Sequence, residues 1–434
     1  MKKLTNILLF ASLSFTAAAT DIVPGNKQTN PILIKGGTLH TVTDGIKENH
    51  DMLIEKGLIS KIGQNLIAPQ NSQVIDASGK QVYPGLIGLS TNLGLVEIGA
   101  VRSTRDNNEV GRATPEVQAH VAYNADSEII PTVRSNGITH VQITPAGSGL
   151  NGQSSLMQLD AWSWENALVK ANTGMHLRWP SVGINKAWWE ERPAEKQKEA
   201  NQKASKQFKK TFEQIKAYAK SRKAKVSKGS KAQALDLRWE AMLPVLARDV
   251  PVFVHADDYR QIEQAIYFAD AEKLKIIIVG GRDADKAAKL LKERKIPVVF
   301  NAAWGRTWRS DEAMDRAFST PAMLESLGIE YSIAIESNWP VRNLAFAAGQ
   351  SIAYGASSDA ALRSVTLHPA RVLGMQDSMG SLTEGKQANI VISSGDLFDH
   401  LTHNVETMLI EGRMIDLDNR HKRLYKKYSA KPKL

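Results

Sequence analysis

Residues 252–300 read VFVHADDYRQIEQAIYFADAEKLKIIIVGGRDADKAAKLLKERKIPVVF, and three short apolar runs alternate there with two longer segments of helical pattern. The run Ile276-Ile-Ile-Val279 is apolar on both faces, as a parallel strand must be when helices cover both sides of its sheet. Strand and helix therefore take turns along this stretch, which predicts a parallel α/β fold.

The same alternation extends outward from this stretch. Apolar runs predict strands at 138–143, 252–255, 275–279, 297–300 and 331–335, and periodic segments predict helices at 263–274, 283–294, 311–318 and 343–354. Repeated strand and helix units on this scale are typical of a (β/α)8 barrel, which takes about 250 residues. We therefore expect a TIM-like barrel over residues 85–377.

Short strands and tight turns flank the predicted barrel on both sides. Residues 31–84 contain apolar runs separated by turns at Gly36-Gly37 and Lys56-Gly57, and hairpin character returns after Ala388. These segments predict a small composite β-sandwich built from residues 31–84 and 378–416. The 434 residues, of which 42% are hydrophobic, suffice for a barrel and one small domain.

The first residues have the three regions of a secretory signal peptide. Two lysines precede a mostly apolar stretch from Leu4 to Phe15, and Ala17-Ala-Ala19 follows. We predict cleavage after Ala19 and a periplasmic or secreted protein. The chain contains no cysteine, so neither a lipidated cysteine nor a disulfide is available, and a large packed core must supply the stability.

The net charge of +10 is concentrated in one segment. Residues 196–231 contain twelve lysines and Arg222 against Glu199 and Glu213, a local excess of +11. We interpret residues 187–231 as a partly exposed helical excursion on the barrel rim. A solvated helix pair and a weak contact with anionic envelope components both remain open, whereas export argues against nucleic acid. Residues 417–434 are predicted to be a mobile basic tail.

A family resemblance begins at the run Val82-Tyr-Pro-Gly-Leu-Ile-Gly-Leu-Ser-Thr-Asn-Leu-Gly94. It resembles the first barrel strand of the amidohydrolase superfamily, in which Pro-Gly-Leu-Ile precedes Asp, any residue, His, any residue, His. Gly88, Ser90 and Asn92 occupy those three ligand positions here. The run from Gly380 to Ile392 is similar to the turn that leads family members back into the sandwich, with Asn389 in place of an Asp. The resemblance is to imidazolonepropionase-like and related periplasmic members.

The resemblance implies zinc or another divalent metal at the carboxyl ends of the strands. His255 matches the histidine that ends the fifth strand, and Glu336 stands where the eighth strand carries an aspartate. The sixth-strand histidine falls near Val279-Gly280, where no nitrogen ligand exists, and no bridging carboxylated lysine is found. A catalytic zinc normally has three protein ligands, so we expect a degenerate site without a tightly bound transition metal.

Without a metal, His255 and Asp257 form a candidate general base, and Glu336 a candidate proton acceptor. Ser90 and Asn92 at the end of the first strand are candidate substrate-binding residues. The glycine-rich stretch 145–155 is predicted to be a loop at the barrel mouth, in which Gln153 and Ser154 contact the ligand.

Two functions from different classes fit these residues. The first is hydrolysis of C–N bonds in cyclic amides or small peptide-like compounds at a reduced site. The second is a catalytically retired, metal-free barrel that binds a ligand or an envelope partner at the same mouth. Lost metal ligands imply loss of the ancestral chemistry, but the same scaffold can host new chemistry. A surface adhesin acting through the Lys-rich segment is a third reading. Deletion of residues 196–231 with no effect on envelope association would exclude it.

Overall fold

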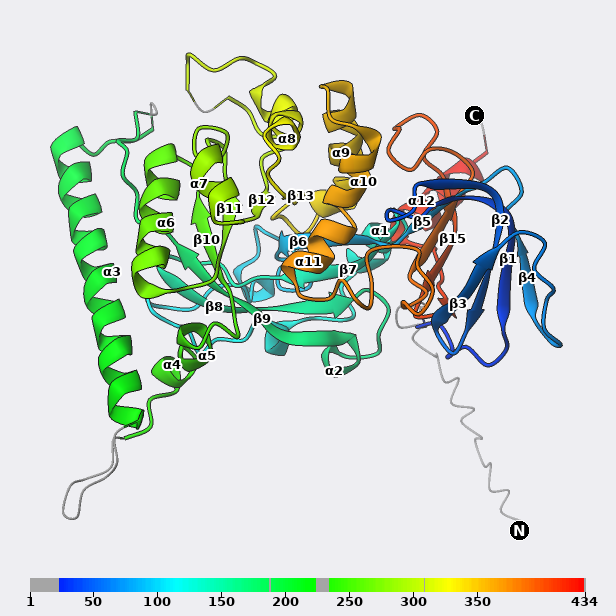
Figure 1. Cartoon of the computed structure of the whole chain (residues 1–434), viewed down its shortest axis with the longest axis horizontal. Helices are drawn as coiled ribbons and strands as arrows, with labels where there is room; N and C mark the ends of the chain where they lie inside the picture. Colours follow the sequence, from blue (N-terminus) through cyan, green and yellow to red (C-terminus); the bar gives the residue numbers. More distant parts are fainter. Residues whose placement is uncertain (1–22, 187–188, 224–233, 308, 433–434) are drawn as a thin grey trace, which may run out of the picture.

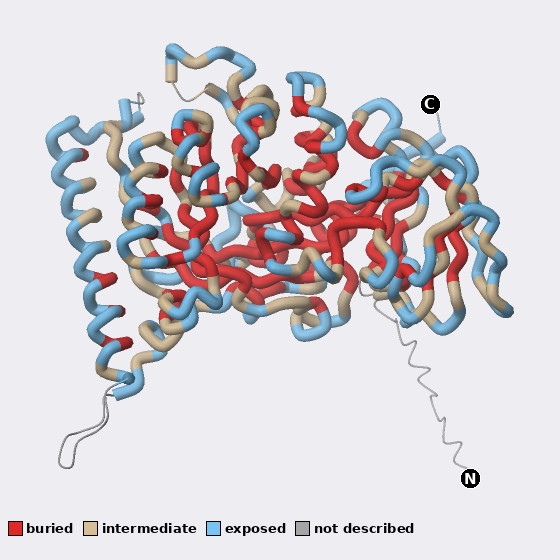
Figure 2. Tube along the Cα trace, in the orientation of Figure 1, coloured by how far each residue is buried: buried red, intermediate tan, exposed pale blue. Residues whose placement is uncertain are grey.

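Residues 23–186, 189–223, 234–307 and 309–432 are described by the computed structural model (Figure 1). The predicted signal peptide, residues 1–19, lies outside them. Within these ranges no helix is both long enough and apolar enough to span a bilayer. The described chain forms two eight-stranded sheets, one at each end of the molecule, and the buried residues concentrate in their strands (Figure 2).

The first sheet joins the two ends of the chain. Its strands are β1 (Ile32–His40), β2 (Ile46–Glu55), β3 (Leu58–Gly63), β4 (Gln73–Asp76), β5 (Gln81–Pro84), β14 (Ile390–Ser393), β15 (Val405–Ile410) and β16 (Arg413–Met414). The order is β16-β15-β14-β5-β1-β2-β3, with β4 paired to β1. β14 pairs antiparallel with β5, so that Ile390 lies opposite Pro84. The strands predicted near the two ends of the chain therefore belong to one hydrogen-bonded sheet.

A bulge in β1 lets the two halves of this strand pair with different neighbours in the sheet. The register shifts between Ile34 and Gly37, and the residues before the shift pair with β4 while those after it pair with β5. A bulge bends its strand and increases its twist, so one long strand can serve two parts of a curved sheet. The Lys56-Gly57 turn between β2 and β3 has positive φ at both residues, +53° and +78°, as a two-residue type I′ hairpin requires.

The second sheet is a nearly closed barrel in the order β13-β12-β11-β10-β9-β8-β7-β6. The main-chain N–H of Asn92, after β6, donates to the carbonyl of Glu336, after β13, at 3.1 Å. The ends of the sheet therefore meet at the carboxyl ends of its strands. The strands are β6 (Leu86–Thr91), β7 (Ile138–Ile143), β8 (Leu150–Gln158), β9 (Leu168–Arg178), β10 (Val252–Ala256), β11 (Ile276–Gly280), β12 (Val298–Phe300) and β13 (Tyr331–Ile333).

The prediction of a regular, all-parallel (β/α)8 barrel is wrong at β8. This strand runs antiparallel to both β7 and β9. Only residues 144–149 connect β7 to β8, and the connection from β8 to β9 contains a single four-residue helix, Trp164–Ala167. Connections this short cannot carry the chain back to start a parallel strand, so they produce antiparallel neighbours. The glycine-rich stretch expected to be a loop enters β8 at Leu150.

Helices cover the outside of the barrel sheet (Figure 1). The α-helices are α1 (Ile130–Arg134), α2 (Trp164–Ala167), α3 (Ala194–Lys223), α4 (Leu237–Glu240), α5 (Leu243–Leu246), α6 (Tyr259–Glu272), α7 (Ala288–Glu293), α8 (Arg316–Ser326), α9 (Leu344–Ala353), α10 (Ser358–Ser364), α11 (Leu367–Val372) and α12 (Arg420–Ser429). Three 3-10 helices lie at Arg102–Thr104, Ala119–Ala122 and Pro340–Asn343. The strict alternation with strands holds for α6, α7 and α8.

The described part of the Lys-rich excursion is mainly α3, one helix along the outer edge of the barrel (Figure 1). Its inner face buries Phe212, Ile215 and Tyr218, and its outer face is exposed (Figure 2). Phe208 and Phe212 pack on Phe268 of α6 at ring distances of 5.0 and 4.9 Å. α3 is therefore attached to the barrel by an aromatic contact, although most of its surface faces water.

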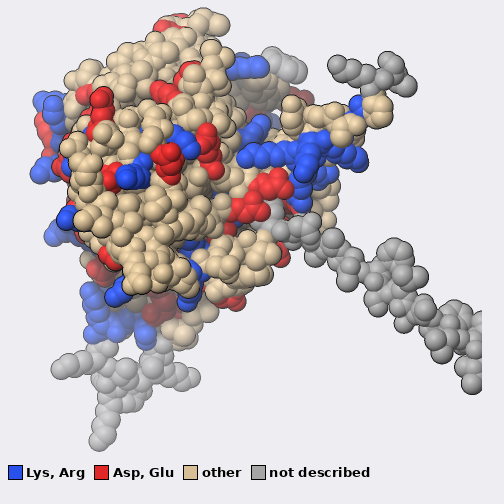
Figure 3. Space-filling model, turned by 90° about the vertical axis from the view of Figure 1, so that its right-hand side faces the viewer, with Lys and Arg blue, Asp and Glu red and all other residues tan. Residues whose placement is uncertain are grey.

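The prediction of a mobile basic tail is wrong for residues 420–429, which form α12. Asn419 caps this helix, because its side chain accepts a hydrogen bond from the main-chain N–H of Lys422 at 3.0 Å. Arg423 also contacts Glu128 at 3.5 Å, which ties the helix to the segment before α1. Figure 3 shows Lys and Arg side chains gathered on a projecting ridge at this end of the molecule.

A buried charge cluster joins the two sheets. Asp160, which follows β8, is 1% exposed and accepts hydrogen bonds from Arg134 of α1 at 2.6 Å and from Arg413 of β16 at 2.7 Å. The main-chain N–H of Gly25 donates to the same carboxylate at 2.9 Å. One carboxylate therefore binds two guanidinium groups where β16 of the first sheet lies against the barrel.

Candidate active site

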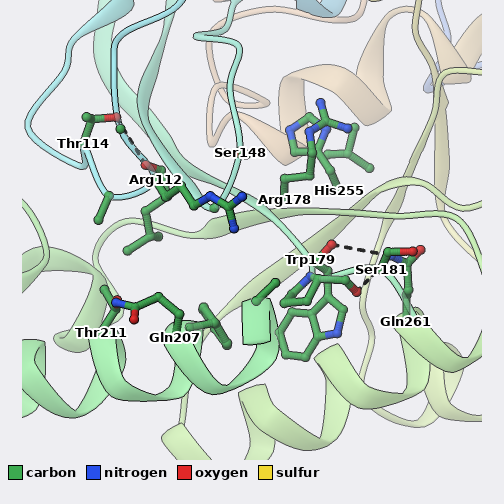
Figure 4. A pocket seen from close by; sticks show the side chains of 18 of the residues that line it. Arg112, Thr114, Ser148, Arg178, Trp179, Ser181, Gln207, Thr211, His255 and Gln261 are labelled. Carbon is green, nitrogen blue, oxygen red and sulfur yellow. Dashed lines mark hydrogen bonds between the residues drawn. The ribbon is translucent and has the colours of Figure 1, made fainter. Parts of the chain in front are cut away.

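A cavity of about 880 Å³ lies at the carboxyl ends of β9 to β13 (Figure 4). In barrels of this type this end carries the reacting groups. Its polar lining includes His255, Asp257, Asn301, Glu336 and Arg178. Ala204, Gln207, Phe208 and Thr211 of α3 also line it, so the inner face of the Lys-rich helix is one wall of the cavity.

Two histidines and a carboxylate form a chain at the base of the cavity. His255 ends β10, and its neighbour His176 lies on β9. The Nδ1 atom of His176 is 3.0 Å from Nε2 of His255, and Nδ1 of His255 is 3.6 Å from Oε1 of Glu336. If His255 carries its proton on Nδ1, toward the carboxylate, its Nε2 accepts the Nδ1–H of His176. His176 therefore orients His255, and His255 faces Glu336.

The surroundings set the charges of this chain. Burial, together with the charges of His255 and Arg178, lowers the pKa of His176 well below its usual value, so His176 is neutral. Partial burial acts to raise the pKa of Glu336. The contact with His255, the hydrogen bond to Asn301 and the charge of Arg178 outweigh burial and lower that pKa. The side chain of Glu336 remains 45% exposed to the cavity, so it is an ionised, accessible base.

Asp257 lies beside this chain in a different environment. Burial raises the pKa of its carboxyl above the usual value, against the opposing charge of Arg282. Its Oδ1 atom is buried without a hydrogen-bond partner and lies 3.9 Å from Nε of Arg282. Two carboxyl groups of one cavity thus have pKa values shifted in opposite directions, which is the arrangement that general acid and base catalysis needs.

The residues present do not fit the metal that the fold family implies. Among the described residues no group of three His, Cys, Asp or Glu side chains is arranged to hold a metal ion. Nε2 of His255 already contacts His176. At the sixth strand Gly280 has φ +98°, and a Cβ there would lie 2.5 Å from Oδ1 of Asp257. The Asp257 carboxylate therefore fills the space that a sixth-strand histidine would need.

We expect the purified protein to contain far less than one transition-metal ion per chain, because a zinc site normally needs three protein ligands. Plasma mass spectrometry on protein prepared without metal-affinity tags measures this directly. Dialysis against a chelator should leave the melting temperature unchanged. Near-stoichiometric zinc, or a melting temperature that falls on chelation, would show that the donor set is larger than the geometry indicates.

The four predicted substrate-binding residues do not line the cavity. Gln153 and Ser154 lie in β8 and are buried. The Gln153 amide donates to the carbonyl of Pro115 at 3.0 Å, and Ser154 Oγ bonds to Gln142 and Thr173 at 2.9 Å each. Both side chains have partners within the protein, so their polar groups stabilise the packing of β8.

Ser90 is buried and Asn92 is half-buried, and neither side chain lines the cavity. Ser90 has φ +56°, and its main-chain N–H donates to Gln142 at 3.3 Å. Its hydroxyl and the Oδ1 atom of Asn92 are buried without a hydrogen-bond partner. The two first-strand positions that carry histidines in the family therefore hold small polar side chains in the core.

Sequence reasoning missed His176, Arg178, Asn301 and Glu116, which contribute to the site. His176 and Arg178 alternate along β9, a strand that was not predicted. The alternation of Gly174-Met-His-Leu-Arg178 was the available signal, because residues two apart share one face of a strand. Asn301 directly follows β12, where the end of a barrel strand is a position expected to carry reacting groups.

Comparisons with known proteins agree with this geometry. The family model described as the amidohydrolase family matches residues 307–415. The amidohydrolase tasK of Hapsidospora irregularis is 24% identical over 385 residues, which cover 80% of this chain and 38% of the relative. A crystal structure of an amidohydrolase from Thermotoga maritima is 27% identical, with a TM-score of 0.76, over 89% of this chain and 99% of that one. The chain belongs to the amidohydrolase superfamily.

This result confirms the superfamily predicted from Val82–Gly94 and from the segment that begins at Gly380. The curated relatives match only over parts of their length. This chain spans 38% of tasK, and a dihydroorotase of Citrifermentans bemidjiense matches over 62 residues at 45% identity, which is 14% of this chain and 15% of the relative. The reaction is therefore inferred from the set of residues that line the cavity.

Proposed function

We propose that the protein hydrolyses C–N bonds of small amides in the cavity at the carboxyl ends of β9 to β13. The observation that carries this proposal is the convergence of His255, Asp257 and Glu336, from β10 and from the segment after β13, on one cavity. The lowered pKa of Glu336 suits it to act as the base, and the raised pKa of Asp257 suits it to act as the acid. The resemblance to amidohydrolases supports the same reaction class.

The geometry suggests an acid–base mechanism that uses only this chain's side chains. Glu336 accepts a proton from a water molecule while the oxygen of that water molecule forms a bond to the amide carbonyl carbon. His255, held in orientation by His176, stabilises the ionised form of Glu336 before the step. Asp257 donates its proton to the nitrogen as the C–N bond breaks, so a carboxylic acid and an amine are released. Water then returns the proton from Glu336 to Asp257.

A substrate screen with a matched variant tests the proposal. Cyclic amides and small peptide-like compounds are incubated with the wild type and with His255→Ala, and the released amine is quantified by mass spectrometry. We expect turnover by the wild type that falls about 10²-fold or more in the variant. Ligand binding without turnover of any compound would favour the catalytically retired barrel. Equal turnover by the two proteins would exclude a role for His255.

The pH dependence follows from the two carboxyl groups. Glu336 must be ionised, so activity rises with pH through its lowered pKa. Asp257 must be protonated, so activity falls as pH rises through its raised pKa. The Asp257→Asn enzyme has no proton to lose at this position, so we expect low activity without the alkaline limb. A pH profile of kcat measures both limbs. Retention of the alkaline limb in Asp257→Asn would assign it to another group.

Export is a separate proposal that rests on residues 1–19 alone. We propose cleavage after Ala19, so that the mature chain begins at Thr20. N-terminal sequencing of protein recovered from the periplasmic or extracellular fraction tests this. A chain that retains Met1, or that stays with the cytosolic fraction, would contradict it.

A further inference from the structure

The cavity wall contains a carboxylate with one oxygen that no hydrogen bond of the described residues satisfies. Glu116 lines the cavity, and its Oε2 atom is buried without a hydrogen-bond partner. The segment around Glu116 runs beside β8, through isolated bridges from Ala113 to Leu150 and from Gln118 to Gln153. A buried acceptor without a donor destabilises the folded protein, because the oxygen has lost its hydrogen bonds to water. A ligand that brings a donor or a positive charge to Glu116 would relieve this destabilisation.

The nearest cation does not remove this need. Arg238 of α4 lies close enough for the charge of Glu116 to act on it. The Arg238 guanidinium is already committed to Asp236, to which it donates two hydrogen bonds at 3.0 and 2.6 Å. Glu116 therefore keeps a free acceptor atom at this wall of the cavity.

Two arginines of the same cavity are not in ion-pair contact with any carboxylate of the described residues. Neither Arg112 nor Arg178 forms an ion pair within the described chain, whereas Arg238 on the same cavity does. The Nε atom of Arg178 donates to the carbonyl of Gly147 at 3.2 Å, which fixes the direction of its guanidinium. Figure 4 shows the side chains of Arg112 and Arg178 extending into the space beside His255. A guanidinium without a partner is the usual binding group for a carboxylate.

The two binding groups belong to different parts of the cavity. Arg178 acts electrostatically on Glu336 and on His176, so it lies at the reacting groups. Glu116 acts on Arg238 of α4, on another part of the lining. The lining also contains Leu150, Trp179 and Phe208, which offer apolar surface to a ligand. The cavity thus presents an anion-binding group, a cation-binding group and an apolar surface together.

We propose that the ligand of this cavity is a zwitterionic amide, a short peptide with a free ammonium group and a free carboxylate. Glu116 binds the ammonium group, and Arg178 with Arg112 binds the carboxylate. This assignment deepens the proposed hydrolase function and rests on it for the reaction. Water adds to the amide carbon, the C–N bond breaks and the nitrogen takes a proton, so the products are two amino acids. The binding itself needs no turnover.

Three probes separate the charged ends: the dipeptide Leu-Leu, its N-acetyl derivative and its C-terminal amide. Affinities are measured by isothermal titration calorimetry on the His255→Ala protein, which does not consume the probe. We expect acetylation and amidation each to weaken binding about tenfold or more, because each removes one charged contact. The apolar side chains are the same in all three probes, so the differences report the termini alone.

Variants assign each end to its residue. In a Glu116→Gln, His255→Ala protein the penalty for acetylation should shrink to about twofold, while the penalty for amidation stays. Arg112→Gln should reduce the penalty for amidation and leave the penalty for acetylation. Glu109→Gln is the matched control, because Glu109 lies on the same segment outside this cavity. Its penalties should equal those of the parent protein.

The outcomes distinguish this proposal from the proposed function. Equal affinities for the three probes, or no binding of any probe up to about 10 mM, would overturn the zwitterion assignment. An acetylation penalty that persists in Glu116→Gln would also overturn it. Discrimination by both termini without turnover in the wild type would keep this assignment and reject the hydrolase. Turnover of amides together with equal affinities for the three probes would keep the hydrolase and reject the zwitterion assignment.

Discussion

The Glu336→Gln enzyme is expected to have a kcat about 10²–10⁴-fold below that of the wild type. Glutamine keeps the size of the side chain but cannot accept the proton of the attacking water. It also removes the negative charge that faces Nδ1 of His255 at 3.6 Å. Because the side chain is 45% exposed to the cavity, the substitution leaves the core packing intact.

Two further variants test this interpretation in the same assay. Glu336→Asp retains a carboxylate and should restore part of the lost kcat. Glu109→Gln, an exposed residue outside the cavity, should match the wild type. A Glu336→Gln enzyme with wild-type kcat and an unchanged acid limb of the pH profile would show that another group accepts the proton.

The Asp160→Asn protein is expected to lose about 3–5 kcal/mol of unfolding free energy. The substitution leaves the guanidinium groups of Arg134 and Arg413 buried without a counterion, since both donate to this carboxylate. The new amide group would also direct donor hydrogens at one of them. Urea unfolding followed by circular dichroism measures the loss from the shift of the midpoint.

A surface ion pair provides the comparison for Asp160→Asn. Glu330 and Arg371 lie 2.9 Å apart, but their side chains are 35% and 47% exposed, respectively. Glu330→Gln should therefore cost less than about 1 kcal/mol. A loss for Asp160→Asn that is no larger than this would show that water reaches the cluster and replaces its ion pairs.

The patterning of the sequence predicted those parts of the fold in which the core decides the structure. The runs at 275–279 and 331–335 contain most of β11 and all of β13, whose side chains are buried on both faces. β8 was missed because its sequence, Leu150 to Gln158, contains glycine and several polar residues. Ser154 of this strand bonds to Gln142 and Thr173 on neighbouring strands, and a hydrophobicity pattern gives no signal for such contacts.

The predicted bounds of a helix were wrong where side chains form ion pairs between segments. A helix was predicted at 283–294, but α7 begins at Ala288. The Asp283 carboxylate instead accepts hydrogen bonds from Lys286, from Arg309 and from the main chain of Tyr259. These contacts hold the residues before α7 in turns. They depend on the tertiary structure, so local propensity could not reveal them.

Resemblance and strand-end position predicted three site residues that the structure brings to one cavity: His255, Asp257 and Glu336. The partner of His255 could not be predicted. His176 lies on β9 and His255 on the adjacent β10, but the whole Lys-rich segment separates these two strands in the sequence. The unpaired Oε2 atom of Glu116 could not be predicted either, because the lack of a hydrogen-bond partner is a property of the folded molecule.

The sheet shared by the two chain ends has a consequence during synthesis. The nascent chain contains β1 to β5 long before the ribosome has added Ile390, and β5 remains without its antiparallel neighbour until β14 emerges. An open strand edge is a template for pairing with other chains. One edge of β5 therefore stays unpaired while the whole barrel is translated.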